Sequence, residues 1–351
     1  MKRLIVLAAM VCVLVPSLGA QTLDKPAATA RLTKTESVTV SQLQKAVASM
    51  ETQAKRSLTK DERRQYLDVL IGNLLLLQAA ARDNVIVSDA ELKTAVGQYE
   101  TQMGTIANLG RAMSDGELQQ YLQGNGVSFE AFQKQLRDQQ TIIDYVKAKR
   151  KSQFDSVKPV TDQDVQDYYD SNKSKFFMDD MVTVRHIFID TRPLTSKEDR
   201  DRAAKRADDI LKELKGGAAF TDLVMKYSED TKSKYKNGVF GSFFRNDPQG
   251  RQLFGSSFFD SVFKLKKGET SSVLQSNLGL HIVQVTDRLG AQLLGLNDKI
   301  PPQNVMTVKE GIKNTLAGQR QNEVFSATLS DLVAELRKQA DVKVFDNNID
   351  W

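Results

Sequence analysis

The chain has almost no sulfur or imidazole chemistry to offer. Its 351 residues include a single cysteine, Cys12, and only two histidines. Cys12 lies inside an N-terminal apolar run and follows Val11 rather than a small residue, which argues against a lipoprotein processing site. Without that run the chain has no thiol, so disulfides, thiol catalysis and thiolate metal sites are excluded. A chain that lacks cysteine is compatible with an oxidising compartment.

Long apolar runs are also scarce. The N-terminal run, residues 4–15, follows two basic residues and is closed by Pro16 and a stretch of small residues that ends at Ala20. This is the pattern of a secretory signal, so we predict that residues 1–20 are a signal peptide and that the protein is periplasmic. The alternative is an uncleaved anchor in the inner membrane, which the run is too short to favour because a span needs ~20 apolar residues.

There is little excess charge of either sign. The formal net charge is +5, and it falls to +3 without Lys2 and Arg3 of the predicted signal peptide. Acidic and basic residues are interleaved, as in 60–64 and 197–202, which is typical of solvated helix faces. No nucleic-acid partner is therefore predicted.

The length exceeds what one hydrophobic core usually organises, so we expect two domains. Residues 21–35 lack periodicity and are predicted to be a flexible lead-in. Residues 36–178 are predicted to form a helical domain that opens with a short strand at 37–41. Capping boxes, in which a Ser or Thr is followed three residues later by an acid, mark the helix starts at 88–91, 114–117 and 161–164.

After Phe177 the spacing of the apolar residues changes from a helical repeat to an alternation of every second residue. Residues 182–189 are apolar on both faces and predict a buried strand, so we begin a second domain at residue 179 and end it at 290. Residues 291–351 contain an amphipathic helix, 308–339, that needs a partner surface and is predicted to pack back on the first domain. The predicted fold class is α+β, with a sheet domain inserted into a helical module built from both ends of the chain.

The two histidines, His186 and His281, lie in the strands that open and close the second domain. Each shares its face with apolar residues, so the imidazoles meet if the strands are neighbours. Taken alone, such a histidine is usually a hydrogen-bonded core residue, and two ligands without a third make no metal site. Ten of the 25 aromatic residues lie between Phe220 and Phe263, in segments that look like loops, which fits either an apolar pocket or a small aromatic core.

Seven short blocks of the second domain, taken in order, strongly resemble the parvulin family of prolyl isomerases. They are 184–188 (VRHIF), 217–223 (GAAFTDL), 227–230 (YSED), 237–243 (NGVFGSF), 258–265 (FFDSVFKL), 267–269 (KGE) and 278–283 (LGLHIV). The helical regions that flank them are similar to the SurA and PrsA group of extracytoplasmic chaperones. The resemblance implies a peptidyl-prolyl cis-trans isomerase and folding chaperone whose clients are unfolded or extended polypeptides with X-Pro bonds, outer-membrane proteins among them, and it implies no cofactor and no metal.

The resemblance also implies a hydrogen-bonded catalytic set and a proline-binding pocket. The first is assigned to His186, Asp230, His281 and Ser276, and the second to Phe240, Phe254 and Phe258. Asp230 could instead be a loop-capping residue, and the phenylalanines could be core. The alternative function is a non-catalytic, peptide-binding chaperone with a degenerate parvulin domain, whereas an unrelated enzyme is disfavoured by the absence of a nucleophile motif, phosphate loop or metal set.

This sequence departs from the family pattern at two places. The usual Gly-Asp-Leu-Gly-Trp stretch is replaced by 238–242 (GVFGS), and Leu278 stands where an aromatic residue is common. Arg192 is nearly alone after the first strand of the domain, so specificity for phosphoserine-proline is not expected.

Overall fold

The computed structural model describes residues 24–107, 109–302 and 304–351, so the predicted signal peptide lies outside the described residues. The chain divides into two compact units. Unit 1 contains the residues up to Pro159 together with Ala317–Trp351, and unit 2 is Val160–Leu316. The α+β class expected from the sequence is observed. In the described part of the chain, no helix combines the length and apolar composition needed to cross a bilayer.

Unit 1 contains a small antiparallel sheet in the order β2-β1-β9, with β2 at Thr35–Thr39, β1 at Pro26–Arg31 and β9 at Asp341–Val344. The flexible lead-in predicted for residues 21–35 is therefore wrong over its described part. Alanines at positions 27, 28 and 30 of β1 are at most 1% exposed, and the strand is paired on both edges. Alanine is a weak strand signal, and the partner β9 lies at the other end of the chain.

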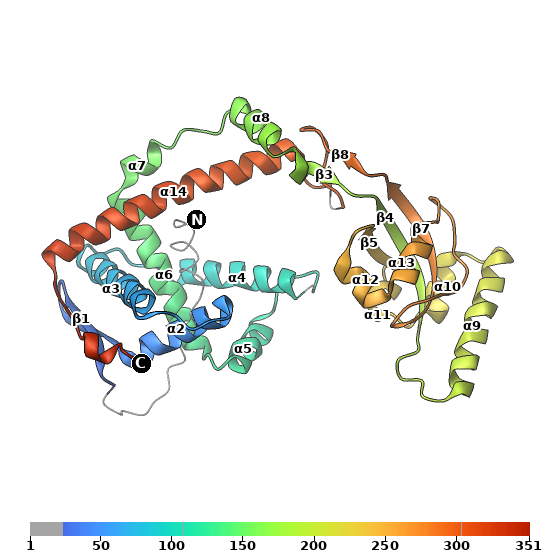
Figure 1. Cartoon of the computed structure of the whole chain (residues 1–351), viewed down its shortest axis with the longest axis horizontal. Helices are drawn as coiled ribbons and strands as arrows, with labels where there is room; N and C mark the ends of the chain where they lie inside the picture. Colours follow the sequence, from blue (N-terminus) through green and yellow to red (C-terminus); the bar gives the residue numbers. More distant parts are fainter. Residues whose placement is uncertain (1–23, 108, 303) are drawn as a thin grey trace. The chain divides into compact units, whose positions relative to one another are not determined.

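The rest of unit 1 is helical (Figure 1). Its helices are α2 (Val40–Ala54), α3 (Lys60–Arg82), α4 (Asp89–Ile106), α5 (Asp115–Gly124), α6 (Phe129–Lys149), α7 (Lys151–Asp155) and the C-terminal part of α14 (Val308–Gln339). Helices α2, α3, α6 and α14 share the main core with the sheet, and α4 and α5 pack with the start of α6 in a second cluster. The capping boxes predicted at Ser88 and Ser114 are present, since each hydroxyl accepts a hydrogen bond from the backbone of the following glutamate. They satisfy amides that the helix itself cannot pair.

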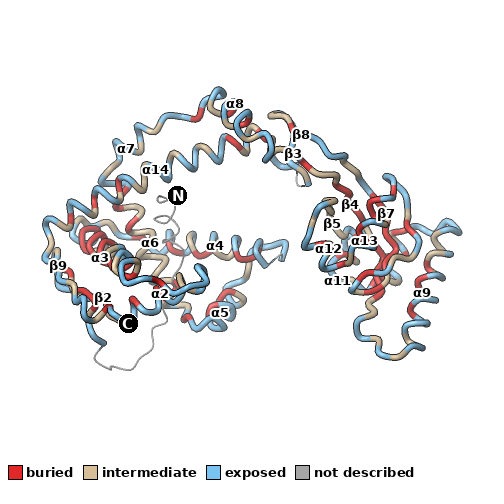
Figure 2. Tube along the Cα trace, in the orientation of Figure 1, coloured by how far each residue is buried: buried red, intermediate tan, exposed pale blue. Residues whose placement is uncertain are grey.

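Helix α14 (Val308–Gln339) spans the residues predicted from its amphipathic pattern, and its C-terminal part belongs to unit 1. Leu332 and Leu336 join the same buried cluster as Leu75 and Leu76 of α3. Gly72 allows the two helices to approach closely, because a Cβ atom there would lie 3.1 Å from Cγ1 of Val333. The helical module is thus built from both ends of the chain, and its buried segments are visible in Figure 2.

Unit 2 is organised by a four-stranded antiparallel sheet in the order β5-β4-β7-β6. Its strands are β4 (Met181–Asp190), β5 (Val239–Phe244), β6 (Leu274–Gln275) and β7 (Gly279–Leu289). Strands β4 and β7 pair from Met181↔Leu289 to Asp190↔Gly279, with one irregularity. The two histidine-bearing strands are therefore central neighbours.

Helices cover both faces of this sheet (Figure 1). On one face lie α9 (Lys197–Lys215) and α10 (Phe220–Tyr227), and on the other lie α12 (Pro248–Phe254) and α13 (Ser256–Val262). The aromatic residues of 254–263, expected in loops, are thus largely helical. Asp247 caps α12 by accepting from the amides of Gln249 and Gly250, and Pro248 occupies its first turn, where no amide is needed.

The rest of unit 2 forms a smaller cluster around Val165, Tyr169 and Val308. It contains α8 (Asp162–Ser171), a 3₁₀ turn at Lys173–Phe176, the β3–β8 ribbon (Phe177–Met178 and Gln292–Leu293) and the first part of α14. The capping box predicted at Thr161 starts α8.

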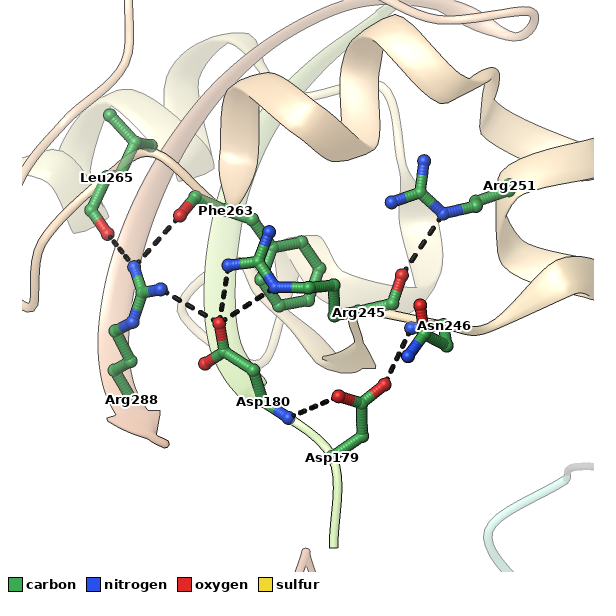
Figure 3. Close-up of polar contacts among 8 residues, drawn as sticks. All are labelled: Asp179, Asp180, Arg245, Asn246, Arg251, Phe263, Leu265 and Arg288. Atoms are coloured by element: carbon green, nitrogen blue, oxygen red, sulfur yellow. Dashed lines mark hydrogen bonds and ion pairs between the residues drawn. The ribbon is translucent and has the colours of Figure 1, made fainter. Parts of the chain in front are cut away.

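A polar cluster around Asp180, which we call the Asp180 cluster, joins the first and last residues of the sheet domain at one end of the sheet (Figure 3). Oδ2 of Asp180, just before β4, accepts from Nε of Arg245 and from Nη2 of Arg288, both at 3.0 Å. Arg288, near the end of β7, also donates from Nη1 to the carbonyl oxygens of Phe263 and Leu265. The start of β4, the end of β5, the end of β7 and the segment after α13 are thus held by one carboxylate.

Candidate functional site

The two histidines lie side by side on the face of the sheet that α12 and α13 cover. In the β4–β7 register, His186 is opposite Val283 and His281 is opposite Phe188, which makes the histidines diagonal neighbours on one face. Their Nδ1 atoms are 3.1 Å apart, and both residues are 1% exposed. The expectation that the imidazoles meet is confirmed.

Asp230 reaches this pair because the segment before it docks along β4. Phe188 donates from its amide to Oγ of Ser228 at 3.2 Å, and its carbonyl accepts from the amide of Glu229 at 2.8 Å. Oδ2 of Asp230 then lies 3.0 Å from Nε2 of His186. Asp230 is also a capping residue, since its Oδ1 accepts from the amide of Lys232, so one carboxylate both caps α11 and hydrogen-bonds to His186.

Ser233 is a site residue that the sequence reasoning missed. Its Oγ lies 3.0 Å from Nε2 of His186, and the residue is 2% exposed. It follows Asp230 by three residues within α11 (Thr231–Lys234), so one turn brings both oxygens to the same nitrogen. That spacing, with a small hydroxyl residue after the predicted carboxylate, was the available signal.

Ser276 lies at the other end of the pair. Its Oγ is 2.8 Å from Nε2 of His281, in a tight turn where its amide donates to the carbonyl of Gly279 at 2.8 Å. The turn presses Gly279 against β4, because a Cβ atom at this glycine would lie 2.2 Å from the carbonyl oxygen of Ile189. Only glycine fits that approach.

These contacts define a direction for the protons. Oγ of Ser276 already accepts from the amides of Leu278 and Gly279, so we assign its own proton to Nε2 of His281. His281 then donates from Nδ1 to Nδ1 of His186, and His186 donates from Nε2 to Asp230 and Ser233. This tautomer assignment satisfies every ring nitrogen.

The series of hydrogen bonds from Ser276 ends on the ionised carboxylate of Asp230. The hydrogen bond from His186 holds the pKa of Asp230 far below its usual range, despite partial burial that acts in the opposite direction. Burial, and next the proximity of His186, lowers the pKa of His281 to about 3. At neutral pH the site therefore holds a neutral His281 and a negative Asp230 whose side chain is 22% exposed.

Aromatic rings line the same face. Phe240 stacks on His186 with ring centroids 3.8 Å apart and an interplanar angle of 12°, and Phe254 meets Phe240 edge to face at 5.3 Å. Phe258 lies 4.9 Å from the His281 ring but is only 1% exposed, so it forms the floor rather than the exposed lining. Phe243, which was not predicted, is half-buried and contacts both Phe240 and Phe254.

The arrangement offers a rigid apolar surface beside one negative charge. Among residues 24–107, 109–302 and 304–351, no group of three or more His, Cys, Asp or Glu side chains could hold a metal ion. The chemistry that these residues can supply is positioning and electrostatics.

Two protein families match this chain. Residues 169–289 match the PPIC-type PPIase domain, and residues 2–144 match the SurA-like N-terminal domain. The first match contains the histidine pair, Asp230 and the aromatic face, and the second covers most of the helices of unit 1. Fold and site together define a helical SurA-like module with an inserted parvulin-type domain. The chain is thus SurA/PrsA-like, with a SurA-like N-terminal domain and a parvulin-type domain.

Curated relatives agree with this assignment. The foldase protein PrsA of Clostridium botulinum (strain 657 / Type Ba4) is 26% identical over 295 residues, which cover 84% of this chain and 76% of the relative. The chaperone SurA of Methylobacillus flagellatus is 24% identical over 292 residues, which cover 83% of this chain and 62% of the relative.

Solved structures of similar proteins match with low TM-scores. A structure described as one of two SurA-like chaperones of Campylobacter jejuni has a TM-score of 0.33 and 20% identity, covering 71% of this chain and 94% of its own. PrsA from Bacillus subtilis has a TM-score of 0.27 and 22% identity, covering 89% and 93%.

Proposed function

We propose that the parvulin-type domain is an active peptidyl-prolyl cis-trans isomerase. The observation that carries the proposal is the hydrogen-bonded series Ser276–His281–His186–Asp230 beneath the half-exposed ring of Phe240. A scaffold that only docks peptides does not require a buried pair of imidazoles that ends on an ionised carboxylate.

Physical chemistry gives these residues separable roles. Rotation of an X-Pro bond crosses a barrier of roughly 18–20 kcal/mol because the twisted amide loses its resonance. Resonance places extra negative charge on the carbonyl oxygen of the planar amide. A fixed negative charge at Asp230 disfavours the planar forms more than the twisted one, while the Phe240 and Phe254 rings hold the pyrrolidine ring in an apolar environment.

A direct test measures the exchange between cis and trans forms of Ac-Ala-Ala-Pro-Phe-NH₂ by NMR, without a coupling protease. The full chain is expected to accelerate exchange, and Asp230→Asn is expected to lower kcat/KM roughly tenfold or more. Asp209→Asn on α9 makes the same chemical change on the opposite face of the sheet and serves as the matched control.

The same experiment separates the two functions. Exchange at the buffer rate with the folded wild-type chain would leave the peptide-binding chaperone as the function. In that case the full chain still suppresses aggregation of an unfolded client, and Asp230→Asn suppresses it equally well.

We further propose that the clients are exported or outer-membrane polypeptides with X-Pro bonds and that this chain works in the periplasm. The support is the secretory pattern of residues 1–20 together with the SurA/PrsA-like assignment. Mass spectrometry of the protein from a periplasmic extract is expected to find an N-terminus at Gln21. An intact N-terminus in the membrane fraction would instead support the uncleaved anchor.

A further inference from the structure

Residues 231–239, which we call the lysine loop, connect two parts of the site. The loop starts after Asp230 and ends before Phe240. Its backbone is fixed by hydrogen bonds from the amide of Lys234 to the carbonyl of Asp230 at 2.9 Å and from the amide of His186 to the carbonyl of Gly238 at 2.9 Å. The lysine loop is therefore held at the rim of the site.

The turn at the end of the loop is equally constrained. Asn237 and Gly238 have φ values of 55° and 77°, which bring the chain back into β5. A Cβ atom on Gly238 would lie 2.7 Å from Cγ2 of Val224 and 2.9 Å from the carbonyl oxygen of His186. Gly238 therefore packs closely against β4 and α10, which fixes the path of the chain at this end of the loop.

Three outward side chains of the lysine loop are basic. Asp230 and Ser233 turn inward to His186, whereas Lys232, Lys234 and Lys236 have no carboxylate partner in the described part of the chain. Lys232 and Lys236 are exposed and Lys234 is half-buried. The loop thus carries three positive charges, none of them in an ion pair with a described carboxylate, beside the single negative charge of Asp230.

Neighbouring carboxylates offset these charges only in part. Asp230 supplies one negative charge at the start of the loop, and its Oδ2 is paired with His186. Glu229 is occupied by Arg206 at 2.6 Å and by the amide of Asp190. Arg192, which follows β4, is not available in the same way as these lysines, because it forms an ion pair with Asp190. The lysines are accompanied by two exposed apolar groups of the same loop, Tyr235 at 75% and Val239 at 52% exposure.

We propose that the lysine loop selects client segments in which an acidic side chain lies next to the proline. This inference rests on the proposed function, because a proline ring held by Phe240 and Phe254 places its flanking residues at the rim. Three lysines on a fixed backbone attract a carboxylate at little conformational cost to the loop. Tyr235 and Val239 offer apolar cover to the stem of the same side chain.

The test compares peptides that differ only in the charge beside the proline. Ac-Xaa-Pro-Xaa-Ala-NH₂ is prepared with Glu, Gln or Lys at both Xaa positions, and exchange is measured by NMR with the full chain. At low salt, kcat/KM for the Glu peptide is expected to exceed that for the Gln peptide roughly threefold to fivefold. The ratio is expected to approach one at about 0.5 M salt, where charges are screened within a few ångströms.

Variants localise the effect. The triple variant Lys232→Gln, Lys234→Gln, Lys236→Gln is expected to lose the preference for Glu. The control variant Lys197→Gln, Lys205→Gln, Lys215→Gln removes the same charge from α9, which packs on the opposite face of the sheet, and is expected to keep it. Thermal unfolding followed by circular dichroism verifies that both variants are folded.

Two results would overturn the inference. One is a wild-type chain that treats Glu and Gln peptides alike or prefers Lys, and the other is a preference for Glu that survives in the triple lysine variant. If no peptide exchanges faster than in buffer, the proposed function fails, but binding of fluorescently labelled peptides still decides this inference by anisotropy. Tighter binding of the Glu peptide that the triple variant abolishes supports it, and equal binding refutes it.

Discussion

His281 is a titratable side chain that is almost completely buried. It is buried between Phe258 and His186, and Oγ of Ser276 is the donor assigned to its Nε2. Burial lowers the pKa of His281 to about 3. Below about pH 6.5 this histidine is therefore protonated in the unfolded chain but stays neutral in the folded chain. A buried neutral histidine makes folding depend on pH.

We therefore expect unit 2 to lose stability as pH falls from 7 to 5. The unfolded state binds the extra proton in this window, which lowers the free energy of unfolding by about 2 kcal/mol. Asp230 affects stability in a different pH range, because the stability that its lowered pKa contributes is lost only below about pH 4. Urea unfolding followed by circular dichroism at each pH measures the slope.

His281→Gln is the matched variant, because an amide can keep one hydrogen bond and cannot titrate near neutral pH. Its unfolding free energy is expected to change much less between pH 7 and 5. An NMR titration gives an independent check, since the chain has only two histidines. An imidazole resonance of His281 that titrates near pH 6.5 in the folded chain would contradict the account.

At the scale of elements, the Asp180 cluster joins four segments of unit 2 through one carboxylate. The side chain of Asp180 is 13% exposed, and its Oδ1 is buried with no hydrogen-bond partner. All of the pairing therefore falls on Oδ2. Removing the carboxylate leaves Arg245 and Arg288 facing each other without a counter-charge.

Asp180→Ala is expected to destabilise unit 2 by about 2–3 kcal/mol, because hydrogen bonds between charged groups are lost and two cations remain. Asp209→Ala, which removes an exposed partner of Lys205, is expected to cost about 0.5 kcal/mol or less. Urea unfolding of the two variants measures the difference. Equal stability of the two variants would show that the cluster is not a structural support.

The elements also show what the sequence could predict. Helix α14 and strand β4 were found because their apolar periods are strong and local. Strand β1 was missed because its alanines give little strand signal and its partner β9 is far away along the chain. Helix α12 was missed although Asp247 and Pro248 carried a helix-start pattern, since the surrounding phenylalanines suggested loops.

The candidate site also contains residues that the sequence predicts and residues that it does not. The ordered motifs contain His186, Asp230 and His281, and Ser276 precedes the last motif by two residues. The structure brings all four together. Ser233 lies outside the motifs, and Phe243 ends one of them without an assigned role. Their positions in the site follow from a helical turn and from the β4–β5 register. The Asp180 cluster depends on long-range contacts that no local pattern encodes.

At the scale of the whole molecule, each unit has its own core. Leu336 belongs to the core of unit 1 and Ile210 to that of unit 2, at 2% and 1% exposure. The single tryptophan, Trp351, lies in unit 1, where the Arg63 guanidinium is 4.8 Å from its ring. Its fluorescence therefore reports the unfolding of unit 1.

Leu336→Ala is expected to lower the stability of unit 1 by about 2–4 kcal/mol, because it removes buried apolar atoms and leaves a cavity. Urea unfolding followed by Trp351 fluorescence measures this loss, and the prolyl exchange rate is expected to be unchanged at low urea. Ile210→Ala is the reciprocal variant and is expected to leave the fluorescence transition in place. A shift of that transition by Ile210→Ala would mean that the two units unfold together.

The β4–β7 pair has a consequence for the history of this architecture. Met181 and Leu289 are paired residues at one end of the sheet, so the polypeptide enters and leaves the domain at nearly the same point. A domain with adjacent ends can replace a surface loop of another domain, whatever the number of residues it contains. The ends of this domain therefore meet the geometric requirement for insertion into, or removal from, a chain at a single loop.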